Sequence, residues 1–282
     1  MKKAIIILFV FLSFYTLAEM TFIKDFTNEN KAFSGFSETE IESGELRKLE
    51  QKAFKPGEIL EYVVHYGLID AGTARIELRD EGKTMAGRKV FHVIGTGVTK
   101  GAFDWFFKVR DRYETFIDAE GIFPYLFVRR VDEGGYIINQ DYKFSHHKKQ
   151  VDVGNGKVFD SPEYVQDMIS AIYFARTINL KNIKPGDVIT IDAFVDNEVW
   201  PAKIRYVGIE NVSIRNGKYN CLVFNPVIQQ GRIFKKESDM RVYITNDENK
   251  IPILAEAKIL VGSVKMELTK YEGIANPLAK IK

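Results

Sequence analysis

The fold class is decided by the stretch Leu60-Glu61-Tyr62-Val63-Val64-His65-Tyr66. Its large apolar residues fall on every second position, a period of two that is typical of a β-strand. A turn over 67–72 follows, and the same alternation returns over 73–79. Because so short a connection favours neighbouring strands of opposite direction, we expect the two segments to form an antiparallel pair.

The pattern continues along the chain on both sides of a single helical segment. Turns rich in Gly, Asn and Asp separate further strand-like segments, at 90–98, 112–118, 125–132, 136–145, 150–153, 188–194, 200–206, 211–215, 221–224, 240–245, 253–260 and 264–271. This spacing predicts a mainly β fold: a large curved antiparallel sheet or a half-open barrel.

One principal helix is predicted between the two groups of strands. Ser161 suits the N-cap and Pro162 the first helical position. Apolar residues then recur at spacings of three and four, at Val165, Met168, Ile169, Ile172 and Tyr173. We expect this helix to run to about 176–179 and to pack its apolar face on the sheet.

The N-terminus has the features of a secretory signal peptide. Lys2 and Lys3 precede a nearly continuous apolar run over 4–14, and small residues stand near Ala18. A membrane anchor is the alternative, but a spanning helix needs about 20 apolar residues and this run is shorter. We therefore expect cleavage after residue 18, export, the periplasm as the compartment, and no transmembrane segment in the mature chain.

The remaining chain divides into three parts. Residues 19–53 are polar without sustained periodicity and are predicted to be a linker or loosely ordered arm. After the turn at Pro56-Gly57, a single β-rich domain is expected over 54–273, with a C-terminal tail at 274–282.

Composition and charge exclude several classes of protein. The 282 residues are 45% hydrophobic and 28% charged, which excludes wholesale disorder. Of 40 basic and 38 acidic residues, cleavage removes two lysines and leaves 38 of each, so no global field would attract nucleic acid or an anionic membrane. The single cysteine, Cys221, excludes an intramolecular disulfide and a multi-cysteine zinc site, and we expect it to be a buried, inert thiol.

Three groups of motifs resemble a bacterial envelope family catalogued as domain of unknown function 3108. The first is Tyr62-Val63-Val64-His65-Tyr66-Gly67 with Ala71-Gly72, and the second is Asp167-Met168-Ile169-Ser170-Ala171-Ile172-Tyr173 with Arg176. The third is Val242-Tyr243-Ile244-Thr245-Asn246-Asp247 with Ile251-Pro252 and Val261-Gly262-Ser263.

The resemblance covers residues 54–273. Tyr243-Ile244-Thr245 stands where the family is expected to carry Trp-Leu-Ser, a departure that keeps the chemical type. The resemblance implies an envelope β-rich fold loosely similar to half-open-barrel lipoprotein carriers, and it implies no activity.

Candidate chemistry is sparse. His146 and His147 are adjacent, so on a strand they would point to opposite faces, and a surface turn is the better interpretation than a metal site. His65 and His92 are interpreted as strand histidines, although they could face a cavity together. No Gly-x-Ser-x-Gly elbow or Gly-x-Gly-x-x-Gly phosphate loop occurs. We assign no catalytic, metal or cofactor residue, and the balance is against an enzyme.

An aromatic segment, Phe103-Asp104-Trp105-Phe106-Phe107, is the strongest candidate for a binding feature. Four aromatics in five positions exceed what one face of a short element can bury, so the segment either plugs the barrel as core or forms a lip over a ligand cavity. For the second case, the ligand-binding candidates are Phe103, Trp105, Phe106 and Phe107, with Arg110 and Arg112 as partners for an anionic head group.

Three functions remain open. The leading hypothesis is a non-catalytic periplasmic protein that binds a lipid or acyl chain in a cavity of several hundred cubic ångströms lined by Phe, Tyr, Ile and Leu. The second is a structural or partner-binding module of the envelope, with a filled barrel and an exposed apolar patch. The third is a hydrolase, which needs His65 or His92 to meet a carboxylate and a nucleophile.

Overall fold

The structure is a computed structural model that describes residues 45–227, 239–259 and 262–281. The predicted signal peptide over 1–18 and residues 19–44 of the predicted arm lie outside the described residues.

The described chain contains sixteen strands and two helices. The first half holds β1 (Ile59–Tyr66), β2 (Ile69–Arg79), β3 (Thr84–Met85), β4 (Arg88–Thr99), α1 (Gly101–Phe106), β5 (Arg110–Asp118), β6 (Pro124–Glu133), β7 (Tyr136–Ser145), β8 (Gln150–Asp152), β9 (Val158–Asp160) and α2 (Ser170–Thr177). The second half holds β10 (Val188–Val195), β11 (Glu198–Ile214), β12 (Gly217–Pro226), β13 (Met240–Thr245), β14 (Pro252–Lys258), β15 (Ser263–Glu272) and β16 (Lys280–Ile281).

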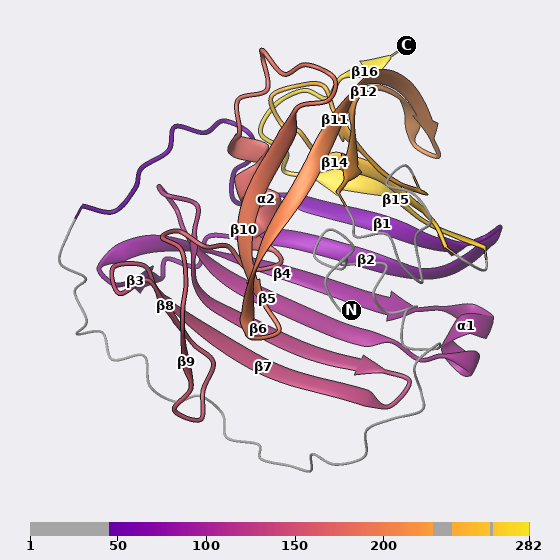
Figure 1. The fold of residues 1–282 in the computed structure, drawn as a ribbon. Coiled ribbons are helices and arrows are strands. Elements are labelled where there is room, and N and C mark those ends of the chain that lie inside the picture. Colours follow the sequence, from indigo (N-terminus) through magenta and orange to yellow (C-terminus); the bar gives the residue numbers. More distant parts are fainter. Residues whose placement is uncertain (1–44, 228–238, 260–261, 282) are drawn as a thin grey trace.

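All strands belong to one large antiparallel arrangement that does not close into a barrel. The order is β10-β11-β12-β13-β14-β15-β1-β2-β4-β5-β6-β7-β8-β9, with β16 beside β12 and β3 beside β4. The pairing of β1 with β15 therefore joins the two halves of the chain. The prediction of a mainly β fold with a large curved antiparallel sheet is confirmed (Figure 1).

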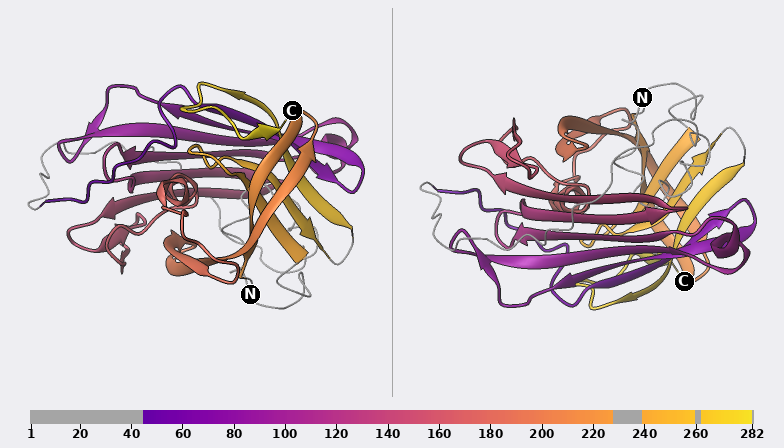
Figure 2. Two further views of the ribbon diagram at one scale, coloured as in Figure 1. Left: turned by 90° about the horizontal axis from the view of Figure 1, so that it is seen from above. Right: turned by 90° about the horizontal axis from the view of Figure 1, so that it is seen from below.

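The sheet curls so strongly that β10, at one end of the strand order, packs over the strands near the other end (Figure 2). Phe194 on β10 meets Tyr142 of β7 with ring centroids 5.2 Å apart, and Phe159 of β9 at 5.8 Å. Arg129 on β6 donates to Asp196, just after β10, at 3.1 Å. Side chains, rather than a backbone ladder, thus hold the two ends of the sheet together.

The principal helix exists, but the prediction of its start was wrong. Helix α2 begins at Ser170, not near Ser161, and ends at Thr177. The backbone of Gln166 instead bridges to β10, accepting from the N–H of Phe194 and donating to the carbonyl of Asp192. Tyr164 has a φ of 57°. Because this backbone is already engaged and left-handed, no helix can pass through it.

Asp167 provides the start signal that the helix uses. Its Oδ1 accepts from the backbone N–H groups of Ile169 and Ser170, at 2.7 and 2.9 Å, and its Oδ2 accepts from the Thr115 hydroxyl on β5. A buried carboxylate therefore both caps α2 and fixes it to the sheet. Burial raises the pKa of Asp167 to about 6.

A buried ion pair anchors the other end of α2. Arg176 donates to both carboxylate oxygens of Glu58, at 2.6 and 2.7 Å, and neither side chain is more than 3% exposed. Arg176 also donates to the carbonyls of Ala53 and Asn249. One guanidinium thus ties α2 to the chain before β1 and to the β13–β14 turn.

Residues at both ends of the predicted domain pack onto it. Leu46 is buried beside Phe116 and Phe123, and Arg47 stacks over the ring of Tyr164 at 4.5 Å, so residues 45–53 are not loosely ordered. At the C-terminus, β16 pairs with β12. The packed body therefore extends beyond residues 54–273 in both directions.

Predictions were also made for the environments of Cys221 and His146. Cys221 is fully buried, as predicted, and burial raises the pKa of its thiol to about 12. His146 and His147 lie in the turn between β7 and β8, as predicted, and His147 is exposed, but His146 is buried: it is 2% exposed and donates from Nε2 to the carbonyl of Pro124 at 2.7 Å. In the part of the chain that the structure describes, neither helix has the length and apolar character needed to cross a membrane.

Candidate ligand cavity

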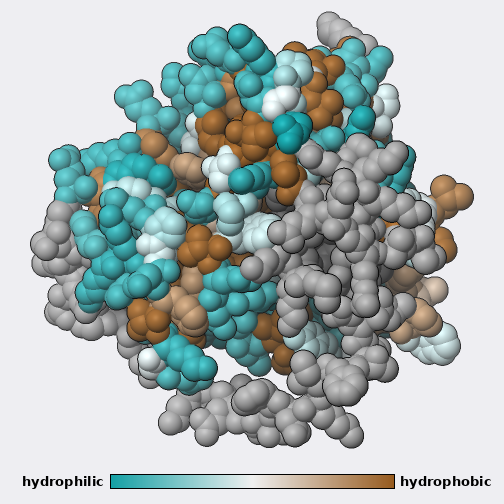
Figure 3. Space-filling view, in the orientation of Figure 1, coloured by the Kyte–Doolittle hydropathy of each residue, from teal (hydrophilic) through white to brown (hydrophobic). Residues whose placement is uncertain are grey.

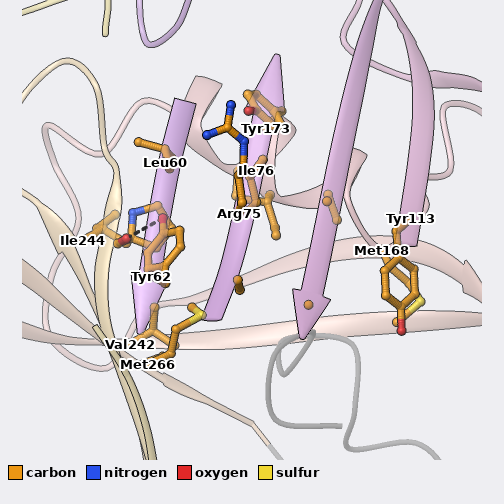
Figure 4. A pocket seen from close by; sticks show the side chains of 18 of the residues that line it. Leu60, Tyr62, Arg75, Ile76, Tyr113, Met168, Tyr173, Val242, Ile244 and Met266 are labelled. Atoms are coloured by element: carbon orange, nitrogen blue, oxygen red, sulfur yellow. Dashed lines mark hydrogen bonds between the residues drawn. The ribbon is translucent and has the colours of Figure 1, made fainter. Parts of the chain in front are cut away.

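An apolar cavity lies between the concave face of the sheet and α2 (Figure 4). Its volume is about 200 Å³, smaller than the several hundred cubic ångströms that the sequence led us to expect. Residues from β1, β2, β4, β5, β10 to β15 and α2 line it, so both halves of the chain contribute.

The floor of the cavity comes from the stretch that decides the fold. Leu60, Tyr62 and Val64 on β1 all line the cavity because their spacing of two places them on one face of the strand. Ile76 on β2 and Met266 on β15 continue this surface on either side (Figure 4). The Tyr62 hydroxyl donates to the carbonyl of Pro252 at 2.9 Å, so its ring presents only apolar surface to the cavity.

The hollow exists because small residues stand where large ones would fill it. Gly95 and Gly97 lie two apart on β4, facing α2 and the cavity. A Cβ on Gly95 would lie 3.0 Å from Cδ1 of Ile169, so this glycine lets the start of α2 approach. A Cβ on Gly97 would meet only Asp111 Cβ, at 3.9 Å, so this glycine leaves open space.

The sequence contains a pattern that indicates this hollow, although the hollow was not predicted from it. The segment Gly95-Thr96-Gly97 lacks the third glycine of a phosphate loop, so its glycines need another explanation. Two glycines separated by one residue within a predicted strand share a face, which indicates a close approach or a cavity on that face.

One end of the cavity is polar and lies near α1. Asp111, on β5, lines the cavity, and the carboxyl of Glu133 on β6 interacts electrostatically with it. Both carboxyls are more than 90% buried, and burial raises the pKa of each. Burial therefore favours the neutral form of both carboxyls near this end of the cavity.

The six residues predicted to bind a ligand do not line the cavity. Phe103 packs on Tyr66 with ring centroids 5.8 Å apart, and Phe107 is buried beneath the β6–β7 turn at Gly134. Trp105 and Phe106 are exposed. The aromatic segment, α1, is therefore neither a plug of the barrel nor a lip on the cavity wall.

The two arginines proposed for an anionic head group are engaged on the surface. Arg110 donates to both oxygens of Asp104, and Arg112 donates to Glu114 at 2.7 Å. Asp111, the residue between them, points to the opposite face of β5 and reaches the cavity. On β5 it is thus Asp111, and neither Arg110 nor Arg112, that lines the cavity.

The two strand histidines do not face the cavity together. His65 pairs with Asp70 at 2.8 Å, and His92 lies between Glu81 and Glu114 at 3.0 and 2.7 Å. Neither residue is part of the cavity wall. His65 also lies 3.9 Å from the buried carboxylate of Glu267.

Comparison with known proteins gives a family but no activity. The model of the family described as "Protein of unknown function (DUF3108)" matches residues 61–269. No curated protein matches the chain.

Two solved structures are similar to this chain. One is a β-barrel-like protein of the domain of unknown function DUF1849 from Brucella abortus, 13% identical, with a TM-score of 0.49 over 77% of this chain and 97% of that chain. Another is a DUF1089 family protein from Pseudomonas aeruginosa, 10% identical, with a TM-score of 0.26 over 74% of this chain and 95% of that chain.

Proposed function

Because the chain belongs to the DUF3108 family of proteins of unknown function, we propose its role from its own cavity: it is an exported, non-catalytic protein that binds a hydrophobic ligand, a lipid or acyl chain, in the concave face of its sheet. The observation that carries this proposal is the apolar space between β1, β2, β4 and α2. An enclosed apolar space of about 150 Å³ is known to bind a molecule the size of benzene. The cavity of about 200 Å³ therefore suits a small apolar molecule or one segment of an acyl chain.

The polar end of the cavity bears on the head group of such a ligand. A head group beside Asp111 meets a buried carboxyl whose pKa is raised by burial, so a neutral hydroxyl can hydrogen-bond there without bringing a second negative charge beside it. A permanently anionic head group would meet carboxyl oxygens instead of the cations first considered, Arg110 and Arg112. We therefore expect monolaurin to bind better than dodecyl sulfate.

A partner-binding role in the envelope is the second candidate. It is favoured by exposed apolar side chains at one end of the sheet, including Trp105 and Leu68. This hypothesis, however, expected a filled barrel, and the space above Gly97 is open. The hydrolase hypothesis required His65 or His92 in a cleft, and neither lines the cavity.

Fluorescence titration with N-phenyl-1-naphthylamine, a neutral apolar probe, tests the cavity. We expect saturable binding of one probe per chain, displaced by monolaurin, and at least tenfold weaker binding in Gly97→Leu. The leucine side chain would occupy the open space, and the extended backbone of β4 accepts it without strain.

Ile209→Phe serves as the matched control because it adds bulk at an exposed position of β11. It should bind the probe as the unchanged protein does. Native mass spectrometry of protein purified from its own envelope, followed by lipid extraction, then identifies the natural ligand. Equal probe binding by Gly97→Leu and the unchanged protein would refute the cavity as the binding site.

Export to the periplasm is part of the proposal and rests on Lys2, Lys3 and the apolar run over 4–14. N-terminal sequencing of the protein from a periplasmic fraction should begin at Glu19. An uncleaved chain in the cytoplasmic fraction would contradict it.

A further inference from the structure

Exposed apolar side chains gather at one end of the molecule. Nine large apolar residues are exposed in the described chain, and six of them lie on three loops that follow one another across the sheet. We call this group the apolar tip: Leu68, Ile69, Trp105, Phe106, Tyr136 and Ile137. Leu68 is fully exposed and Trp105 is 91% exposed.

The three loops of the apolar tip are physically joined. α1 lies between the β1–β2 turn and the β6–β7 turn (Figure 1). The N–H of Lys100, before α1, donates to the carbonyl of Ala71 on β2 at 2.9 Å. On the other side, the N–H of Gly134 donates to the carbonyl of Lys108 at 2.7 Å. In the space-filling view, apolar side chains project from this end of the molecule (Figure 3).

The apolar residues of α1 are held outward by the fold. Phe103 and Phe107, four residues apart, share one face and pack on Tyr66 and the β6–β7 turn. Asp104 accepts from the Thr99 hydroxyl at 2.8 Å and pairs with Arg110. Because α1 is fixed on this side, Trp105 and Phe106 must face solvent. This exposure is therefore built into the structure and is not the result of a loose segment.

The charges around the apolar tip leave two lysines available. Asp104 is paired with Arg110, Asp70 is paired with Arg215, and Asp132 accepts from the N–H of Gly135. Lys100 and Lys108 flank α1, are exposed, and take part in none of the ion pairs between described residues. Exposed Trp, Tyr, Phe and Leu bordered by lysine is the composition of a membrane-interface segment.

The shape of the apolar tip also favours a bilayer over a protein. A stable protein interface covers about 800 Å² on each partner with close shape complementarity. Here single side chains project from two hairpin turns and one helical turn, which a fluid lipid surface can surround without matching pockets. The cavity extends toward the apolar tip, because two of the residues that line it, Thr99 and Val109, lie on either side of α1.

We propose that the apolar tip docks on an anionic lipid surface, with Leu68, Trp105 and Phe106 inserted among the lipids and Lys100 and Lys108 on the head groups. Docking does not require an occupied cavity, so it stands independently of the ligand.

Tryptophan fluorescence can test the docking of the apolar tip on lipid. Trp105 and Trp200 are its two tryptophans, and Trp200 is partly buried against the core. In Trp200→Phe, vesicles of phosphatidylethanolamine and phosphatidylglycerol should shift the emission to the blue, and brominated lipids should quench it. In Trp105→Phe, where only Trp200 reports, neither change should occur.

Co-sedimentation with the same vesicles tests the other residues. The double variant Leu68→Asp, Phe106→Asp should bind at least tenfold more weakly, whereas the matched control Ile209→Asp, an exposed apolar residue on β11, should bind as the unchanged protein does. Lys100→Gln with Lys108→Gln should weaken binding to these vesicles and leave the weaker binding to phosphatidylcholine unchanged.

Two results would overturn the proposal. One is the absence of both co-sedimentation and an emission shift at low salt, where attraction to anionic lipid is strongest. The other is a dimer in analytical ultracentrifugation that Leu68→Asp with Phe106→Asp dissociates, since a second copy would then cover the apolar tip. Gly97→Leu should dock normally, which separates failure of docking from failure of ligand binding.

Discussion

The buried charged and titratable residues of this protein have structural partners that sequence reasoning did not assign. Arg176 was expected near the end of the helix, and the structure shows that it also satisfies Glu58 and two backbone carbonyls. His146 was expected in a surface turn, yet it lies among Phe123, Tyr125 and Tyr164. The surroundings of both residues are set by long-range packing. Because this packing decides which polar residues are buried, no local sequence pattern predicts it.

Loss of the Arg176 guanidinium should destabilise the fold strongly. In Arg176→Ala, the Glu58 carboxylate would remain buried without its partner, which typically costs about 3–5 kcal/mol. Urea denaturation measures this change in the free energy of unfolding. Arg112→Ala removes an exposed pair with Glu114 and should cost less than about 1 kcal/mol. Equal losses in the two variants would show that the buried pair has no special weight.

The stability of the fold should fall in mild acid through His146. Burial lowers the pKa of this imidazole to about 4, whereas an unfolded chain titrates near 6.5. The folded state therefore binds the proton less readily than the unfolded state. This contribution is complete above about pH 6.5 and is lost as the pH falls toward 4, by about 3 kcal/mol in total.

Comparison with His146→Gln isolates that contribution. The glutamine can still donate to the Pro124 carbonyl but does not titrate, so its unfolding free energy should depend less on pH between 7 and 4. The exposed neighbour gives the control, and His147→Gln should follow the unchanged protein. Identical pH profiles for His146→Gln and the unchanged protein would exclude this histidine as the source.

Strands were predicted better than the helix because the alternation that marks a strand is visible within a few neighbouring residues. The alternation in β1 gave its face and its extent, and the turns between strands marked most of the ladder. The helix was extended too far toward the N-terminus because Val165 and Met168 have helical spacing but are buried for other reasons, with Gln166 bound to β10. The open space of the cavity depends on Gly95 and Gly97, and the sequence does not show which residues pack opposite them.

The two glycines of β4 should respond differently to the same substitution. Gly95→Val would press against Ile169 at the start of α2 and should destabilise the fold by about 1–3 kcal/mol. Gly97→Val faces open space in an extended strand, so it should be neutral or stabilise by up to about 1 kcal/mol. Thermal and urea unfolding of the pair give the comparison. The reverse order would mean that α2 does not rest on Gly95.

At the scale of the whole molecule, the class of fold was predictable but its limits were not. Polar composition over 19–53 predicted a linker or arm, although Leu46 and Ala53 are buried and the Arg47 side chain donates to the carbonyl of Gly121. A few apolar residues within a polar segment give no periodic signal, yet they suffice to dock it. The curl that brings β10 over β7 likewise depends on contacts between distant segments.

Truncation tests where the packed body begins. A chain starting at residue 45 serves as the reference, because it keeps the contacts of Leu46 and Arg47 with the described residues. A chain starting at residue 54 loses the burial of Leu46, worth about 1.5–3 kcal/mol, together with the stacking of Arg47. Its midpoint in urea should fall clearly. Coincident unfolding curves would restore the boundary predicted from the sequence.

The absence of a side chain at position 97 has a consequence for evolution. A glycine codon becomes an alanine or valine codon by one base change, and at this position the backbone conformation accepts either residue. The capacity of the cavity can therefore drift in small heritable steps while the strand ladder around it stays intact. Related chains that retain the same sheet could differ in the size of molecule they hold, and the residue at this position is where that difference should first be sought.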